Sequence, residues 1–193
     1  MVKCKLILII YIKEGVDVPR EMILLPYDAE WVKRFEEIKQ ELLIIFGNLA
    51  IDIQHFGSTA IVGMSAKPII DVMVIVGDIL KVDSLNLEME RAGYVAKGEN
   101  GMSGRRYFQK FHSDGINHTQ HIHCYEKNNQ AAIDELMFRD YLNINNEAFD
   151  TYMNVKIEAS KKHRYSPLGY TEFKTDCVNG IMKQAKMYFA KLV

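Results

Sequence analysis

The chain has 193 residues, enough for one large domain that buries about 70% of the surface exposed by its unfolded form. Its 24 lysines and arginines nearly balance its 25 aspartates and glutamates, which disfavours nucleic acid and anionic membranes as partners and leaves a small molecule as the expected one. Three scattered cysteines exclude a disulfide framework and suit a reducing compartment, so we expect a cytoplasmic protein.

The N-terminal part contains an apolar run at residues 6–12 that is too short to span a bilayer and lacks a small-residue cleavage site. We therefore expect no membrane association. No repeat, low-complexity tract or linker divides the remainder, which predicts a single domain.

Apolar residues recur at every third or fourth position from Trp31 to Ile45, which predicts an amphipathic helix behind Asp28 as its N-cap. Residues 51–56 then alternate as a strand. Residues 69–76 are apolar enough for a central strand covered on both faces. The first half of the chain is thus expected to fold as a helix followed by two strands.

A short helix is expected over residues 84–92, with Gly93 as its C-terminal cap. Strand-like runs at residues 105–111 and 119–125 predict a hairpin with its loop near residues 113–117. Helical spacing then predicts three more helices, around residues 133–141, 149–156 and 170–188. This order predicts an α+β fold with a mixed, mostly antiparallel sheet packed by helices and a helical C-terminal third.

Asp71 lies within the apolar strand 69–76. A carboxylate desolvated in such a place must be paired, hydrogen-bonded or bound to a cation, or else it takes up a proton. Two interpretations stay open: a structural tie to a lysine or to a helix N-terminus, and contact with a metal or ligand.

The dipeptide Gly57-Ser58 stands between the two predicted strands. A turn without a Cβ lets backbone N–H groups approach an anion, and the serine hydroxyl adds a donor. By itself the dipeptide is equally an ordinary loop. Its position just before the strand that carries Asp71 favours an anion site.

His121 and His123 are two residues apart on a predicted strand, so both imidazoles project from one face, where a metal or a phosphate can bridge them. The alternative is a pair of half-exposed histidines on a hairpin. His118 and His112 flank the loop and are expected to be ordinary surface residues.

Several cations are suited to clamp a phosphate, because guanidinium and ammonium groups pair with phosphoryl oxygens. Arg105 and Arg106 face opposite sides of a strand, so at most one of them enters a shared site. Tyr170 and Lys174 lie one turn apart on a helix. They either form a polar contact or simply pack together where the core meets its edge. The cations expected at the site are Lys67, Arg105, Arg139 and Lys174.

With these residues in place, the chain resembles the GrpB family, a group similar to the polymerase-β-like nucleotidyltransferase superfamily. The resemblance runs from about Met22 to the C-terminus. It implies that residues 1–21 are a dispensable extension and that residues 22–193 form the family's domain. The matching positions are Pro26-Tyr27 with Trp31, His-Phe-Gly-Ser-Thr-Ala at 55–60, Lys-Pro-Ile-Ile-Asp at 67–71, His121 with His123, Phe-Arg-Asp-Tyr-Leu at 138–142, and Tyr170 with Lys174.

The resemblance implies nucleotidyl transfer, in which Gly57, Ser58 and Thr59 hold a triphosphate and Asp71 holds a divalent metal. Active superfamily members generally carry a second carboxylate two residues beyond the first, where this chain has Met73. His121 or His123 takes the third acidic position. Imidazole is a poor ligand for Mg²⁺ and an acceptable one for Mn²⁺ or Zn²⁺, so all three metals stay open.

Two functions follow from the resemblance. The chain is either a metal-dependent transferase, with Asp71, His121 and His123 as catalytic and metal-binding residues, or a catalytically degenerate module that binds a nucleotide or phosphate. Family members fused to dephospho-coenzyme-A kinase suggest a nucleotide or coenzyme-like partner. A purely structural domain would leave Asp71 and the histidine pair without a role. The acceptor and the oligomeric state are left open.

Overall fold

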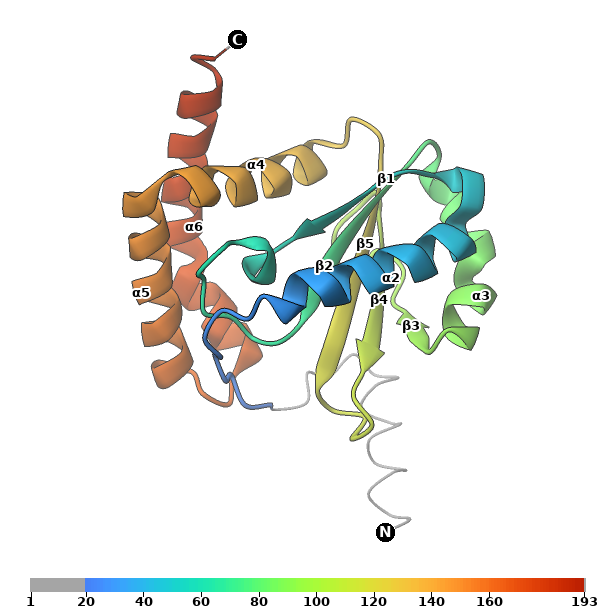
Figure 1. The fold of residues 1–193 in the computed structure, drawn as a ribbon, viewed down its shortest axis with the longest axis horizontal. Helices are drawn as coiled ribbons and strands as arrows, with labels where there is room; N and C mark the ends of the chain where they lie inside the picture. Colours follow the sequence, from blue (N-terminus) through green and yellow to red (C-terminus); the bar gives the residue numbers. More distant parts are fainter. Residues whose placement is uncertain (1–19, 193) are drawn as a thin grey trace.

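The computed structural model describes residues 20–192, which form a five-stranded sheet with helices beside it (Figure 1). The strand order is β1-β2-β5-β4-β3. The central pair, β2 and β5, is parallel, and the other three pairs are antiparallel, so the predicted mixed, mostly antiparallel sheet is confirmed. The strands are β1 (Ala50–Phe56), β2 (Ile70–Val76), β3 (Tyr94–Ala96), β4 (Arg105–Phe111) and β5 (His118–Glu126).

Helix α2 (Glu30–Phe46) covers one face of the sheet and packs on β1 and β2. Its apolar stripe is buried as the spacing predicts up to Leu42, but Phe46 and not the predicted Ile45 is its last buried residue. The stripe forms one core with the strands. The helix begins two residues after Asp28, whose carboxylate accepts a hydrogen bond from the N–H of Glu30 at 2.9 Å. The stripe consists of Trp31, Phe35, Ile38, Leu42 and Phe46.

Three C-terminal helices stand beside the sheet, away from α3, and confirm the predicted helical third (Figure 1). They are α4 (Gln130–Ile144), α5 (Asn146–Lys162) and α6 (Pro167–Phe189). Their shared core also takes in Ile61 and Met64, from the connection between β1 and β2. This packing holds the helices against the end of β2 that carries Asp71.

The region between β2 and β4 differs from the prediction. The expected helix over 84–92 is a 3₁₀ segment η3 (Ile79–Leu85) followed by α3 (Asn86–Arg91). Gly93 then takes a φ of +88°, and β3 follows it as an edge strand that the sequence does not predict. Three residues are too few for strand alternation to show, so β3 is defined by its pairing with β4.

The predicted extension, residues 1–21, lies almost entirely outside the described residues, and its role stays a prediction. Met22 is buried against Ala159 and Tyr170, and its N–H donates to the carbonyl of Arg164 at 2.7 Å. Within residues 20–192 no helix combines the length and the apolar character needed to cross a membrane.

Replacement of Leu42 by alanine tests whether α2 supplies the core. Leu42 is 0% exposed, whereas Ile44 on the same helix is 84% exposed. Leu42→Ala is expected to lower the free energy of unfolding by about 2–5 kcal/mol in urea titration, because it leaves a cavity. Ile44→Ala should change it by less than about 0.5 kcal/mol. Equal losses in the two variants would contradict the packing of α2.

Candidate functional site

The turn after β1 is built around Gly57, which adopts a φ of +70° and a ψ of −169°. A Cβ at this position would overlap the carboxylate of Asp71 on the neighbouring strand. Glycine is therefore needed for its backbone conformation and for the close approach of Asp71. These contacts account for the glycine without an anion, and the predicted access for an anion stays a prediction.

Thr59 fastens this turn to the start of β2. It is buried, its Oγ1 donates to the carbonyl of Ile69 at 3.3 Å, and it lies 3.0 Å from Nε2 of His55. Burial lowers the pKa of His55 to about 4, so this imidazole is neutral at pH 7. The threonine hydroxyl thus has a structural role in holding the turn.

A cavity of about 250 Å³ opens beside the turn. It gathers seven of the sequence-predicted residues: Gly57, Ser58, Thr59, Lys67, Asp71, His121 and Lys174. Helices α5 and α6 add residues that the sequence analysis does not assign to the site: Tyr152, Lys156, Tyr170 and Thr171.

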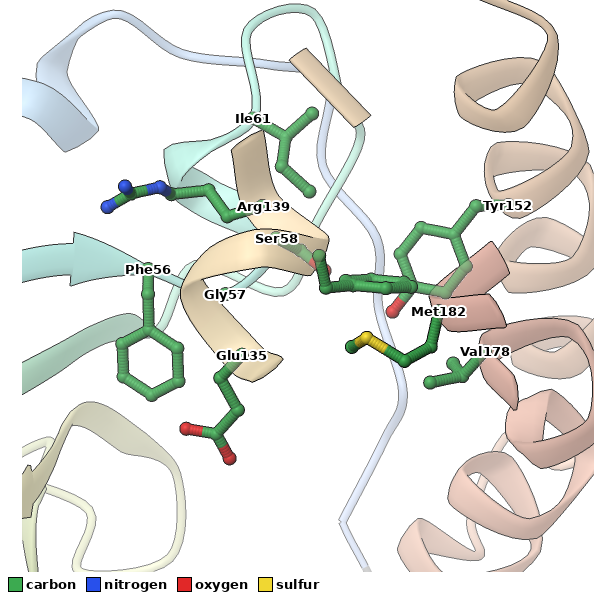
Figure 2. A pocket seen from close by; sticks show the side chains of 10 residues that line it. Phe56, Gly57, Ser58, Ile61, Glu135, Arg139, Tyr152, Val178 and Met182 are labelled. Carbon is green, nitrogen blue, oxygen red and sulfur yellow. The ribbon is translucent and has the colours of Figure 1, made fainter. Parts of the chain in front are cut away.

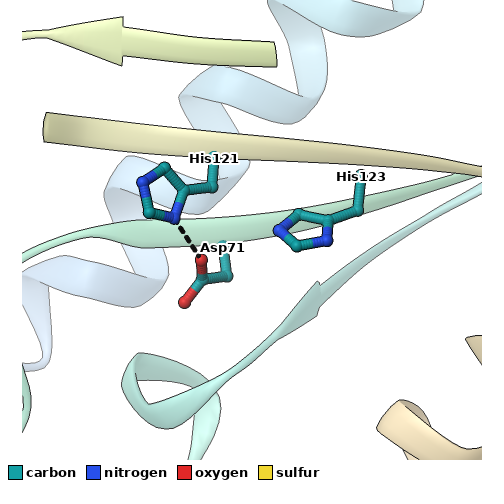
Figure 3. Close-up of side chains that lie close together, drawn as sticks. All are labelled: Asp71, His121 and His123. Carbon is teal, nitrogen blue, oxygen red and sulfur yellow. Dashed lines mark hydrogen bonds and ion pairs between the residues drawn. The ribbon is translucent and has the colours of Figure 1, made fainter. Parts of the chain in front are cut away.

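Asp71 and His121 are direct neighbours across the parallel pair β2 and β5. Asp71 Oδ1 lies 3.0 Å from His121 Nδ1, as Figure 3 shows. Burial alone would raise the pKa of Asp71, but the hydrogen bond and charge of His121 hold it below its ordinary value. The Asp71 side chain keeps 26% of its surface exposed, so the prediction of a strand covered on both faces is wrong at this position.

His118 extends this contact into a row of three side chains. Its Nδ1 lies 2.7 Å from Nε2 of His121, and its ring is half-buried. The expectation that His118 is an ordinary surface residue is therefore wrong. Because both nitrogens of His121 have partners, its orientation beside Asp71 is fixed from two sides.

His123 lies deeper on the same face, between the rings of Phe56 and Tyr107. Both of its ring nitrogens are buried without a hydrogen-bond partner. Burial lowers its pKa to about 3, so the ring is neutral. One ligand atom from each of Asp71, His121 and His123 lies within 4.8 Å of the others. The predicted grouping of these three residues is therefore present in the structure.

Two lysines from the C-terminal helices enter the cavity beside Lys67. Lys156 is 1% exposed and donates to the carbonyl of Ser65 at 2.7 Å. Burial, with the charges of Lys174 and Lys67, holds its pKa well below the ordinary value. Burial and the charge of Lys67 likewise lower the pKa of Lys174 to about 8. The ring of Tyr170 lies against both Lys67 and Lys174, 5.4 and 4.3 Å from their Nζ atoms.

The two predicted arginines lie outside this cavity. Arg105 donates to the carbonyls of Glu99 and Asn100. Arg139 donates to the carbonyl of His55 and to the side chain of Gln54. Both guanidinium groups thus hold loops or strands, which a count of charges in the sequence does not reveal.

Met73 stands where a second carboxylate would be expected. It is fully buried and packs in a cluster with Phe56, Tyr125 and Ala132. No described acid joins Asp71 within the distance that a shared metal needs. The strand therefore offers a single carboxylate.

Comparison with known proteins gives one family. The model of the GrpB protein family matches residues 21–184. The UPF0157 protein YqkA of Bacillus subtilis is 37% identical over 169 residues, which are 88% of this chain and 48% of that protein. The chain thus spans about half the length of YqkA.

A solved structure and a longer relative extend the comparison. The crystal structure of the conserved protein GrpB from Enterococcus faecalis has a TM-score of 0.81 and 40% identity, over 86% of this chain and 99% of that one. A dephospho-CoA kinase of Mycobacterium tuberculosis is 26% identical over 163 residues, which are 72% of this chain and 40% of that protein.

Replacement of Gly57 by alanine tests the contact between the turn and Asp71. Gly47 offers a matched control, because its φ of +49° and ψ of −129° also favour glycine while a Cβ there meets nothing within 4 Å. Gly57→Ala is expected to lower the free energy of unfolding by about 1–3 kcal/mol more than Gly47→Ala, because only the former displaces a side chain. Urea titration measures both, and similar losses would contradict the contact.

Proposed function

The chain belongs to the GrpB family, and from that premise we propose that it binds the phosphate groups of a nucleotide or another phosphorylated small molecule. The binding site is the cavity between the Gly57 turn and helices α5 and α6. The observation that carries this proposal is the convergence of Lys67, Lys156 and Lys174 on a cavity whose described lining includes a single acid, Asp71.

Lys67, Lys156 and Lys174 lie close enough for their charges to act on one another. The lowered pKa values of Lys156 and Lys174 have burial as their main cause and lysine charges as the second. An anion placed among these lysines would favour their charged forms. A phosphate offers several oxygens and more than one negative charge, which suits a group of ammonium donors better than a carboxylate does.

Neutral donors complete such a site. Ser58 brings a hydroxyl to the cavity from the turn and Tyr152 brings one from α5, whereas the hydroxyl of Thr171 already donates to the carbonyl of Pro167 at 3.0 Å. Burial raises the pKa of Tyr152 to about 12, so this phenol keeps its proton and can donate it to an acceptor. The phosphate chain would thus meet lysines and hydroxyl groups in one cavity.

The kind of molecule that carries the phosphate is also part of the proposal. The relative from Mycobacterium tuberculosis is named a dephospho-CoA kinase, and this chain matches part of it. A nucleotide or a coenzyme-like molecule is consistent with that context and with the family resemblance. Because the relatives differ in length, the activity of any longer protein remains a separate question.

Metal-dependent nucleotidyl transfer is the second candidate function. Asp71, His121 and His123 would hold the ion, because their ligand atoms lie within 4.8 Å of one another and both His123 nitrogens lack a partner. One carboxylate and two imidazoles suit Zn²⁺ or Mn²⁺ better than Mg²⁺. A bound ion would supply positive charge beside the phosphate. Met73 supplies no second carboxylate, which favours binding over transfer.

Replacement of Lys174 by methionine tests the phosphate site, and the exposed Lys183 on the same helix is the matched control. Lys174→Met is expected to weaken the binding of tripolyphosphate roughly tenfold to a hundredfold in isothermal titration calorimetry, because a charge-assisted hydrogen bond is lost. Lys183→Met should bind tripolyphosphate as the unmodified chain does. Equal binding by the unmodified chain and Lys174→Met would contradict the proposal.

The pKa of Lys174 gives the same titration a second readout. The ammonium form dominates below about pH 8, and the neutral form dominates above it. A bound anion raises this pKa, so tripolyphosphate binding at pH 8.5 should take up protons. The measured enthalpy should therefore vary with the ionisation enthalpy of the buffer, and this variation should shrink in Lys174→Met.

Metal binding is tested by thermal unfolding with Zn²⁺, Mn²⁺ or Mg²⁺. Zn²⁺ and Mn²⁺ are expected to raise the melting temperature, since an ion that binds the native state stabilises it. Asp71→Asn and His123→Gln should lose the shift, while His112→Gln, at an exposed position, should keep it. An undiminished shift in Asp71→Asn would rule out this metal site.

A further inference from the structure

A second cavity, of about 190 Å³, is also lined by Gly57 and Ser58, and none of the three lysines is part of its lining. Figure 2 shows Phe56 and Glu135 on one side of it, and Tyr152, Val178 and Met182 from α5 and α6 on the other. Apart from Glu135 and Arg139, its side chains are apolar or carry a hydroxyl group. It is therefore suited to an organic group rather than to an ion.

Glu135 is the polar feature of this cavity that its surroundings leave unexplained. Its Oε1 accepts a hydrogen bond from the hydroxyl of Tyr125 at 3.3 Å, whereas its Oε2 is buried without a partner. Burial raises the pKa of Glu135 to about 7. A buried carboxylate oxygen without a donor costs free energy, and the carboxyl group avoids this cost either by holding a proton or by accepting a donor that arrives with a ligand.

The neighbouring arginine does not supply that donor. Arg139 lines the same cavity, but its guanidinium bonds to Gln54, to the carbonyl of His55 and to Asp140. Among the ion pairs of the described residues none includes Glu135.

The two cavities share three of their lining residues, Gly57, Ser58 and Tyr152. Each is smaller than an ordinary small-molecule site of about 300–1,000 Å³, and the two together reach that range. A ligand with its phosphates among the lysines could therefore pass the turn and place its organic part beside Glu135.

We propose that the second cavity receives an amino-substituted nucleobase, whose amino group donates a hydrogen bond to the carboxylate of Glu135. This inference rests on the proposed phosphate site and adds the class of the group attached to it. A flat ring fits the apolar walls that Phe56, Val178 and Met182 provide. The exocyclic amino group of adenine or cytosine is the donor that the carboxylate lacks.

Two pairs of nucleotides test the proposal, because the members of each pair differ in the amino group. ATP is compared with purine riboside triphosphate, and CTP with UTP, by isothermal titration calorimetry on the full chain. In at least one pair the amino-bearing nucleotide should bind roughly tenfold to a hundredfold more tightly than its partner. Tripolyphosphate is titrated alongside as a probe without a base.

Variants of Glu135 complete a double-mutant cycle. Glu135→Leu should abolish the preference for the amino-bearing nucleotide and leave the affinity for tripolyphosphate unchanged. Glu135→Gln keeps an acceptor oxygen and should therefore retain part of this preference. Val178→Phe narrows the cavity, so it should weaken the binding of the amino-bearing nucleotide but not the binding of tripolyphosphate. Glu147→Gln, at an exposed position on α5, is the control that should keep the preference.

The possible failures are distinguishable. If tripolyphosphate binds but neither pair shows a preference, or if Glu135→Leu leaves a preference intact, the nucleobase inference is overturned and the phosphate site stands. If neither tripolyphosphate nor any nucleotide binds, the phosphate site and the inference that rests on it are both overturned.

Discussion

Three lysines that face one cavity dominate the electrostatics of this protein. Lys156 and Lys174 are held below their ordinary pKa by burial and by like charge, and Asp71 is the single acid in the described lining of the cavity. Burial of Lys156 and Lys174 beside like charge disfavours their ammonium forms in the ligand-free chain. A phosphate group would offset that effect, which is the physical reason to assign the cavity to an anionic ligand.

The fold brings these groups together through three separate contacts. The parallel pairing of β2 with β5 places His121 beside Asp71, and the Gly57 turn closes on the same carboxylate. Packing of α5 and α6 on the connection after β1 then brings Lys156 and Lys174 to that end of the sheet. Because the acid comes from the sheet and two of the three lysines come from the helices, the site depends on the docking of the helical third.

Much of this arrangement could be predicted from local patterns. The alternation of a strand predicts that His121 and His123 lie on one face, and the helical repeat predicts most of the buried stripe of α2. Both patterns can be recognised within a few neighbouring residues. The Gly57-Ser58 turn and Asp71 were linked by their closeness in the chain. Long-range features could not be predicted in this way: the parallel partner of β2, the bond between His118 and His121, and the roles of Arg105 and Arg139 all depend on how distant segments pack.

Some of the missed residues left a signal in the sequence. Lys156 falls on the apolar face of its predicted helix with Phe149 and Met153. Because lysine is rarely buried unless it has a partner, a lysine at a core position indicates a functional or structural contact. Glu135 left none, because a glutamate on a helix is ordinary until the surrounding core shows that its oxygen lacks a donor.

The most direct measurement of the central claim is a crystal structure of the chain with tripolyphosphate. Phosphate density is expected between Ser58 of the turn and the Nζ atoms of Lys67 and Lys174, with Asp71 still beside His121. Phosphate density only elsewhere on the molecule, or a cavity closed by the lysine side chains at saturating tripolyphosphate, would contradict a phosphate site in this cavity.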